Sequence, residues 1–242
     1  MIKATGVTKS YTTSSSEVRA VDDAYLEVKQ GEFVLILGRS GSGKSTLLGM
    51  LAGLIQPTNG AVRIQDREIS NLAEDMIADL RAKKIGFVFQ FSGLIPTLTA
   101  LENVMLPTLF CREGAGCGSR ALDLLKKVGM TDRADAYPRT LSSGEMKRVA
   151  IARALINEPV ILIADEPTGD LDVDTEYEIM ELFRQLNREG TTIVMVTHNP
   201  DLVPYATRTY GMDKGKLGER AAVTCGMGMN EPGGPREQTG SP

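Results

Sequence analysis

Residues 38–45 read Gly-Arg-Ser-Gly-Ser-Gly-Lys-Ser, and this stretch decides the fold of the 242-residue chain. It matches the pattern GxxxxGK[ST], with an apolar strand-like segment at 33–37 before it and a helical segment at 45–52 after it. Glycines allow the main-chain amides of such a loop to turn toward phosphate groups, and the start of the following helix adds a favourable field. We expect Lys44 to neutralise the β and γ phosphates of a nucleotide, and Ser45 to bind Mg²⁺. The expected phosphate-contacting residues are Gly38, Ser40, Gly41, Ser42, Gly43, Lys44, Ser45 and Thr46.

Composition limits the classes of protein to which the chain can belong. Hydrophobic residues make up 42% and charged residues 24%, which is typical of a globular chain and excludes collagen-like, disordered and disulfide-scaffold classes. The formal net charge of −4 argues against nucleic acid as a partner. Cys111, Cys117 and Cys225 lack the spacing of zinc ligands relative to each other and to the single histidine, His198.

The longest apolar stretches of the sequence are about as long as a strand. Examples are 85–89 and 160–164, whereas a helix that crosses a bilayer needs about 20 apolar residues. The first residues, 1–6, also lack the apolar core of a secretory signal. We therefore expect the chain to be made and kept in the cytosol.

Strand-like and helical segments alternate along most of the chain. The expected strands are 33–37, 61–65, 85–89, 160–164 and 191–196. Residues 91–140 contain helical segments alone, and capping boxes are expected for Asn71 with Glu74 and for Thr99 with Glu102. This alternation predicts an α/β fold with a mainly parallel sheet that is interrupted by an all-helical insert.

A second candidate site follows the apolar segment 160–164. This expected strand ends in Asp165 and Glu166, so both carboxylates would lie at the carboxyl edge of the sheet, where ligands of open α/β sheets bind. We expect Asp165 to hold Mg²⁺ through its water, and Glu166 to orient or deprotonate the water that attacks the γ phosphate. The alternative is a strand that simply ends in two solvated acids.

Residues 141–145, Leu-Ser-Ser-Gly-Glu, precede Lys-Arg-Val-Ala-Ile-Ala-Arg-Ala-Leu at 147–155, and together they resemble the signature motif of ATP-binding-cassette (ABC) ATPases. As bare chemistry the stretch is either a second phosphate-recognition surface at a helix N-terminus or just a capped helix. The resemblance extends over residues 2–218. It implies a P-loop NTPase core with a mainly parallel sheet, a small antiparallel β subdomain and an inserted all-helical subdomain. The ABC ATPase domain would span 1–218, with the helical subdomain at about 91–145 and a loose tail at 219–242.

The resemblance implies ATP and Mg²⁺ as ligands and gives roles to further residues. Gln90 is similar to the Q-loop glutamine, which senses Mg²⁺ and the attacking water. His198 is similar to the switch histidine, which contacts the γ phosphate, and Tyr11 resembles the A-loop aromatic residue that stacks on adenine. The expected catalytic set is Glu166, His198, Gln90 and Lys44, and the expected magnesium set is Ser45, Gln90 and Asp165.

A head-to-tail homodimer in the ATP-bound state is also implied by the resemblance. Each ATP would lie between the phosphate-binding loop of one chain and Ser142 and Gly144 of the other, with Asp172 of the D-loop as a further contact. Ser143 stands where the family normally has a glycine, and Met146 stands where glutamine is common. If position 143 required a torsion that only glycine accepts, the serine would cost roughly 1–2 kcal/mol.

Within the family, residues 91–104 and 165–172 are most similar to the branch of lipoprotein release, macrolide export and cell division. This likeness implies an ATPase that powers an integral membrane permease on a separate chain, for export or for extraction of lipids or lipoproteins. The ATPase would then lie at the inner face of the cell membrane. The alternative is an ATP-gated regulator or mechanical transmitter that binds a membrane protein without moving a substrate.

Two other nucleotide-dependent classes are disfavoured by the sequence. A GTPase would need an Asn-Lys-x-Asp motif to read the base, and the sequence has none. A chromosome or DNA-repair clamp would have a long coiled coil between the phosphate-binding loop and the signature, where this sequence has short helical segments.

Overall fold

The computed structural model describes residues 1–12, 17–110 and 117–220. Cys111 and Cys225 lie outside these ranges, as do residues 221–242 of the expected tail at 219–242. Glu219 and Arg220, the first two residues of that expected tail, are instead the end of strand β10.

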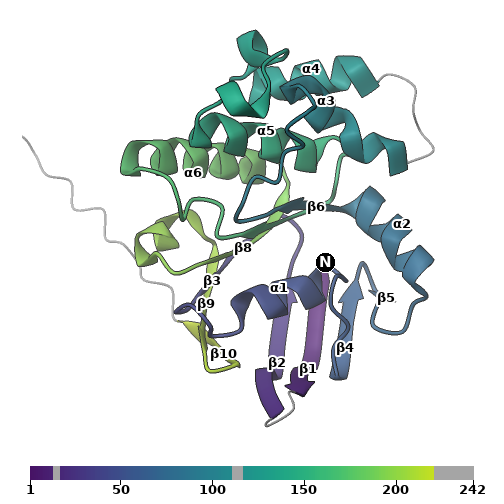
Figure 1. The fold of residues 1–242 in the computed structure, drawn as a ribbon. Helices are drawn as coiled ribbons and strands as arrows, with labels where there is room; N and C mark the ends of the chain where they lie inside the picture. The colour runs from purple at the N-terminus through teal and green to yellow at the C-terminus, as the bar shows by residue number, and fades with distance from the viewer. Residues whose placement is uncertain (13–16, 111–116, 221–242) are drawn as a thin grey trace, which may run out of the picture.

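A six-stranded, mainly parallel sheet forms the centre of the molecule (Figure 1). Its strand order is β10-β9-β3-β8-β7-β6, and every neighbouring pair is parallel except β9 with β10. The strands are β3 (Phe33–Leu37), β6 (Ile85–Val88), β7 (Ile161–Asp165), β8 (Thr192–Thr197), β9 (Arg208–Asp213) and β10 (Lys216–Arg220). The α/β fold with a mainly parallel sheet is therefore confirmed.

A four-stranded antiparallel sheet in the order β2-β1-β4-β5 lies below the first sheet in Figure 1. Its strands are β1 (Ile2–Thr12), β2 (Glu17–Val28), β4 (Asn59–Ile64) and β5 (Arg67–Glu68). Helix α1 (Lys44–Leu51) lies between the two sheets, because its leucines pack in one apolar cluster with residues of both. This arrangement agrees with the small antiparallel β subdomain implied by the family resemblance.

Helices cover the other face of the six-stranded sheet, in the upper half of Figure 1. Besides α1, the described helices are α2 (Glu74–Lys84), α3 (Ala100–Met105), η1 (Leu106–Phe110), α4 (Cys117–Lys127), η2 (Thr131–Arg133), η3 (Pro138–Thr140), α5 (Ser143–Leu155), α6 (Val173–Arg188) and η4 (Pro200–Tyr205). Of these, α2 is not part of the layer on the other face, because its Leu80 packs in the same apolar cluster as α1. All described helices from α3 to η3 lie between β6 and α5, which is the region of the expected all-helical insert. None of the described helices is both long and apolar enough to cross a membrane.

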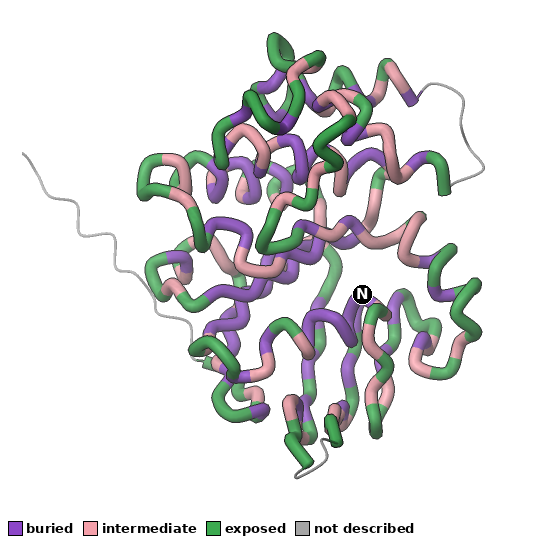
Figure 2. The backbone as a smooth tube through the Cα atoms, viewed as in Figure 1, coloured by how far each residue is buried: buried purple, intermediate pink, exposed green. Residues whose placement is uncertain are grey.

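Strand β3 is buried on both faces, which explains its continuous apolar sequence (Figure 2). Phe33 and Leu35 pack into the cluster beneath α5 and α6, whereas Val34 and Ile36 pack toward α1 and the antiparallel sheet. Successive side chains of a strand point to opposite faces, so a strand between two apolar layers needs hydrophobic residues at every position. The phosphate-binding loop therefore begins at the end of a strand that is fixed from both sides.

One expected helix cap is confirmed and one is wrong. Thr99 and Glu102 form the predicted capping box at the start of α3. The predicted box of Asn71 with Glu74 does not form, because α2 begins at Glu74 itself and Ala73 occupies the cap position. The Asn71 amide instead donates a hydrogen bond of 2.8 Å to Glu68, so the preceding turn uses this side chain.

Candidate functional site

The carboxyl ends of β3, β7 and β8 meet at one edge of the central sheet and carry most of the residues singled out by the sequence. They border a cleft of about 800 Å³. Its lining residues are Ala20, Leu37, Gly38, Arg39, Ser40, Gly41, Gly43, Lys44, Ser45, Thr46, Gln90, Glu166, His198, Pro200 and Arg220. The phosphate-binding loop, Gln90, Glu166 and His198 are thus brought together as expected, and Ala20 and Arg220 are additions that sequence reasoning did not identify.

The loop that follows β3 wraps around the ammonium group of Lys44. The Lys44 side chain is buried, and its Nζ atom donates hydrogen bonds to the carbonyl oxygens of Gly38 at 2.8 Å and Arg39 at 3.0 Å. Gly43 adopts a φ of 104°, and a Cβ atom at this residue would clash with the carbonyl oxygen of Ala20. Glycine is therefore required at position 43 by both torsion and space.

Glu166 lies between Lys44 and His198 in the cleft. Its Oε1 atom is 3.2 Å from Nζ of Lys44, and its Oε2 atom is 2.5 Å from Nδ1 of His198. The Glu166 backbone has a φ of 42°, in the left-handed region that non-glycine residues seldom adopt. Such a conformation costs free energy and persists only where the surrounding structure enforces it.

Ser45 and Asp165 form a second polar pair beside this group. The Ser45 hydroxyl donates a hydrogen bond of 3.1 Å to Oδ1 of Asp165, which ends β7. Burial raises the pKa of Asp165, and the hydrogen bond from Ser45 opposes that effect. A hydroxyl and a carboxylate are oxygen ligands of the kind that Mg²⁺ prefers, usually together with waters and substrate phosphates.

Two observations test whether the loop fits a phosphate–magnesium ligand. The hydroxyl of Ser42 is buried and has no hydrogen-bond partner among the described residues, so it is available to a bound group. The described part of the chain also contains no cluster of three or more acidic, histidine or cysteine side chains that could hold a metal by itself. The residues fit Mg²⁺ that is held partly by phosphate oxygens rather than by a complete protein cage.

The segment that carries Gln90 is fastened to α5 by two cationic side chains that the sequence did not single out. Nζ of Lys147 donates a hydrogen bond of 2.6 Å to the carbonyl oxygen of Gln90. The guanidinium group of Arg153 donates bonds of 2.7 Å to the carbonyl oxygens of Ser92 and Gly93. Both residues lie in the stretch that resembles the family signature. Their hydrogen-bond partners are far away in sequence, so no local sequence pattern indicates these contacts.

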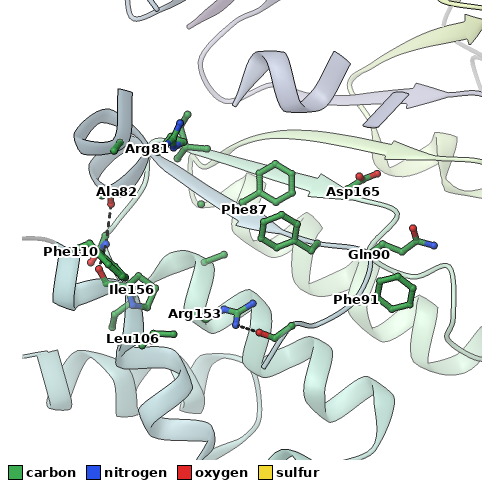
Figure 3. Close-up of a pocket in the computed structure, with 18 residues that line it drawn as sticks. Arg81, Ala82, Phe87, Gln90, Phe91, Leu106, Phe110, Arg153, Ile156 and Asp165 are labelled. Carbon is green, nitrogen blue, oxygen red and sulfur yellow. Dashed lines mark hydrogen bonds between the residues drawn. The ribbon is translucent and has the colours of Figure 1, made fainter. Parts of the chain in front are cut away.

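A second cleft, of about 790 Å³, adjoins the first and shares Gln90 with it. Figure 3 shows its aromatic lining, with Phe87 and Phe91 near Gln90 and with Phe110 at the far end. Phe91 is 74% exposed and Phe110 is 77% exposed. Large exposed apolar side chains that gather around a cleft are characteristic of a binding surface.

Six residues of the expected binding and magnesium sets are not among the described residues that line the nucleotide-sized cleft: Ser42, Asp165, Tyr11, Asp172, Ser142 and Gly144. Asp165 lines the adjoining aromatic cleft instead. Tyr11 lies on β1 opposite Val18 of β2. Asp172 caps α6 and accepts hydrogen bonds from the amide and hydroxyl of Thr175. Ser142 and Gly144 lie at the start of α5.

The signature stretch begins α5 with a capping box that the sequence analysis did not identify. The amide of Glu145 donates to the Ser142 hydroxyl at 3.2 Å, and the amide of Ser142 donates to the Glu145 carboxylate at 2.8 Å. The hydrogen bond from the Ser142 amide is the main cause that lowers the pKa of Glu145. Ser143 is the first helical residue and is absent from the described residues with positive φ. The strain considered for a serine at this position therefore does not occur.

Gly144 is the residue of the signature that must be small. A Cβ atom at this position would lie 2.6 Å from Cγ2 of Thr175, which is the third residue of α6. The start of α5 therefore packs closely against the first turn of α6, and a side chain at 144 would have to displace Thr175.

The phosphate-binding loop, the acidic end of β7, the histidine after β8 and the capped signature helix define an ABC-type nucleotide-hydrolysing cassette. The family model described as ABC transporter matches residues 21–169, and the chain belongs to this family. It is an ATPase whose ligands are ATP and Mg²⁺.

Comparison with individual proteins places the chain among ATP-binding cassettes. It is 49% identical over 193 residues to the lipoprotein-releasing system ATP-binding protein LolD of Aquifex aeolicus, covering 79% of this chain and 86% of that protein. It is 43% identical over 215 residues to the macrolide export ATP-binding/permease protein MacB of Chlorobaculum tepidum, covering 89% of this chain. The chain spans only 33% of that MacB protein's length.

A solved structure supports the same placement. The dimeric, post-hydrolysis structure of the ATP-binding cassette MJ0796 of Methanocaldococcus jannaschii, bound to ADP and Pi, superposes with a TM-score of 0.85. The two chains are 43% identical, and the match covers 91% of this chain and 98% of the other. At this level of identity the likeness extends beyond the fold to the ATP-binding cassette itself.

Proposed function

We propose that Glu166 and His198, facing Lys44 in one cleft, are the chemical centre of ATP hydrolysis in this chain. The observation that carries this proposal is the Glu166 carboxylate, with one oxygen 3.2 Å from Nζ of Lys44 and the other 2.5 Å from Nδ1 of His198. Lys44 binds the β and γ phosphates. Glu166 orients the attacking water and accepts its proton, and His198 contacts the γ phosphate from the end of the neighbouring strand β8.

The magnesium ion belongs beside this group in the proposal. Ser45 and Asp165 are already in hydrogen-bond contact, and Gln90 lines the same cleft from the end of β6. When bound, Mg²⁺ neutralises charge on the β and γ phosphates during phosphoryl transfer. Ser45 would bind the ion directly, Asp165 would bind it through water, and Gln90 would complete the set.

The adenine base is proposed to extend toward the antiparallel sheet. Ala20 of β2 lines the cleft, and Tyr11 lies opposite Val18, two residues before Ala20 on the same strand. A base that passes Ala20 would reach the ring of Tyr11, on which it could stack.

We further propose that two copies associate head to tail around two ATP molecules. Ser142 and Gly144 of each copy contact the nucleotide of the other, and Asp172 is a further nucleotide contact. The dimeric structure of MJ0796 supports this arrangement. Val173, next to Asp172, supports it too, because its side chain is 80% exposed at the start of α6.

The membrane partner is proposed to dock in the aromatic cleft shown in Figure 3. A permease segment in this cleft would contact Phe91 and Phe110 and would lie against Gln90, which also lines the nucleotide cleft. Movement at the docked segment would therefore reach the magnesium site through one residue. The relatives named LolD and MacB support lipoprotein release or export as the work performed. The match to 86% of LolD supports a permease on a separate chain, with this ATPase at the inner face of the membrane.

Replacing Glu166 by glutamine tests the catalytic proposal. The variant keeps the shape of the side chain and its contact with Lys44 but removes the proton acceptor. We expect phosphate release to fall below about one hundredth of the wild-type rate, while ATP produces a dimer that light scattering detects. Phosphate release at the wild-type rate would refute the role of Glu166, and loss of ATP binding would place the residue in binding rather than chemistry.

Replacing Phe110 by aspartate tests the docking proposal. The matched control is Tyr25→Asp, because Tyr25 is an exposed aromatic residue on β2 that is not among the described residues lining the cleft. We expect Phe110→Asp to hydrolyse ATP normally when isolated and to lose membrane recruitment in cells, while Tyr25→Asp keeps both. Equal membrane recruitment of the two variants would contradict the docking site. If the wild-type protein is recruited to the membrane but no substrate is moved, the alternative function, an ATP-gated regulator of a membrane protein, is favoured.

A further inference from the structure

The carboxylate of Glu176 joins two loops that are separate in sequence. Its Oε1 atom accepts a hydrogen bond of 2.6 Å from the hydroxyl of Thr168. Its Oε2 atom accepts a hydrogen bond of 3.0 Å from the side-chain amide of Asn199. Each carboxylate oxygen is thus used for a different loop, and the carboxylate forms a bridge between them.

The two bridged loops are those that carry Glu166 and His198. Thr168 follows Glu166 by two residues, and Asn199 follows His198 directly. Thr168 is only 4% exposed, so its bond to Glu176 is shielded from water. Neither Thr168 nor Glu176 is among the described residues that line the nucleotide cleft. Their effect on the reaction must therefore act through Glu166 and His198.

The sheet alone does not fix the relative position of Glu166 and His198. Strands β7 and β8 are paired as far as Asp165 and Val196, and the amide of Glu166 makes one more bond to the carbonyl of Val196. Beyond that point the chain leaves the sheet, Glu166 takes up its left-handed torsion, and the side chains of Glu166 and His198 approach to 2.5 Å. An unusual torsion beside a short contact needs external bracing, and Glu176 supplies it from the first turns of α6.

We infer that Glu176 is a positioning residue for ATP hydrolysis, which holds the Glu166 and His198 loops at the separation that their contact requires. The inference rests on the proposed roles of Glu166 and His198. Glu176 does not touch the nucleotide, so its removal should lower the rate of the chemical step and leave ATP affinity unchanged. Small displacements of reacting groups are sufficient for large losses of rate.

Three substitutions distinguish the bridging role of Glu176 from an effect of its negative charge and from an effect on the stability of helix α6. Glu176→Ala removes both hydrogen bonds. Glu176→Gln keeps both, because the amide oxygen can accept from Asn199 while the amide nitrogen donates to the Thr168 hydroxyl. Asp174→Ala is the control, since Asp174 is the other acidic residue in the first turn of α6, where a negative charge also stabilises the helix N-terminus.

The experiment measures kcat, the KM for ATP and thermal unfolding of the full chain for each variant. We expect Glu176→Ala to lower kcat about tenfold or more with KM within about twofold of wild type. Glu176→Gln should retain most of the wild-type kcat, and Asp174→Ala should match wild type. Thr168→Val, which removes one of the two bonds while keeping the side chain's shape, should fall between wild type and Glu176→Ala.

Several results would overturn the inference. These are a wild-type kcat in Glu176→Ala, equal losses in Glu176→Ala and Glu176→Gln, or a loss in Asp174→Ala as large as that in Glu176→Ala. A fall in kcat that is matched by a rise in KM or by unfolding at the assay temperature would also contradict it. Glu166→Gln is assayed in parallel. If this variant hydrolyses ATP normally, the proposed catalytic role of Glu166 is wrong. If it is inactive while Glu176→Ala is normal, only the positioning role of Glu176 is refuted.

Discussion

The Nζ atom of Lys147 lies 2.6 Å from the main-chain carbonyl oxygen of Gln90 and 3.4 Å from that of Phe89. Lys147 is 1% exposed, and burial lowers the pKa of its ammonium group while the charge of Asp170 opposes that effect. The helix that bears the signature is therefore fastened to the segment between the nucleotide cleft and the aromatic cleft. Movement of that segment should be transmitted to Ser142.

Replacing Lys147 by methionine should disconnect helix α5 from the segment that carries Gln90 without unfolding the chain. Methionine has a similar volume, and the lost hydrogen bonds are offset by relief of a buried charge, so the free energy of unfolding should change by about 2 kcal/mol or less. ATP turnover should fall several-fold, because Gln90 is no longer held. Urea unfolding and phosphate-release assays check both statements, with the exposed Lys126→Met as control. Normal turnover in Lys147→Met would show that the bond has no functional role.

Replacing Gly144 by alanine should destabilise the chain by about 1–3 kcal/mol, because the new methyl group meets Cγ2 of Thr175 across the α5–α6 contact. Thr175→Ser removes that methyl group and keeps the hydroxyl that bonds Asp172. The double variant Gly144→Ala/Thr175→Ser should therefore recover most of the lost stability in urea unfolding. If the double variant is instead as unstable as the sum of the two single variants, close packing at this contact is not the cause of the destabilisation.

Replacing Ser143 by glycine should leave ATPase activity equal to that of the wild type. Ser143 has an ordinary helical torsion, so there is no strain for glycine to relieve. The free energy of unfolding should fall by at most about 1 kcal/mol, because glycine is a poorer helix residue. A large loss of activity in a phosphate-release assay would reveal a specific role for the serine hydroxyl.

Acidification should destabilise the signature helix through Glu145. Its pKa is lowered in the folded chain, chiefly by the amide of Ser142 and further by Arg133, from an ordinary value of 4.5. The ionised carboxylate therefore stabilises the folded state above about pH 4.5, and this contribution is lost as the pH falls through the lower folded-state pKa. Glu145→Gln should show a smaller loss of unfolding free energy than wild type between about pH 6 and pH 3.5. Parallel pH profiles for the two proteins would exclude this contribution.

The sequence predicted those parts of the molecule in which local chemistry decides the structure. The bounds of β3, the capping box of Thr99 with Glu102, and the placement of Lys44 and Glu166 at one sheet edge follow from local pattern and the general geometry of parallel sheets. The expected role of His198 came from the family resemblance. The predicted cap at Asn71 is wrong because a competing partner, Glu68, was equally close in sequence.

The bridging and fastening residues could not be predicted from the sequence. Glu176 and Lys147 both lie on helices whose periodicity gives no sign of their partners. The Lys147 ammonium reaches a carbonyl 57 residues away, and the Glu176 carboxylate reaches an amide 23 residues away. Such contacts depend on how helices and loops pack in three dimensions, which a local pattern does not contain. The Tyr11 assignment also rests on family likeness, since the ring does not line the cleft.

The position of β3 between β8 and β9 has a consequence for how the chain is made. Phe33 pairs with Ile193 of β8, and Leu37 pairs with Gly211 of β9. While the ribosome adds residues from the N-terminus onward, the strand that leads into the phosphate-binding loop has neither neighbour until nearly all of the described chain has emerged. We therefore expect the chain to become able to bind ATP only late in its synthesis, when β8 and β9 pair with β3.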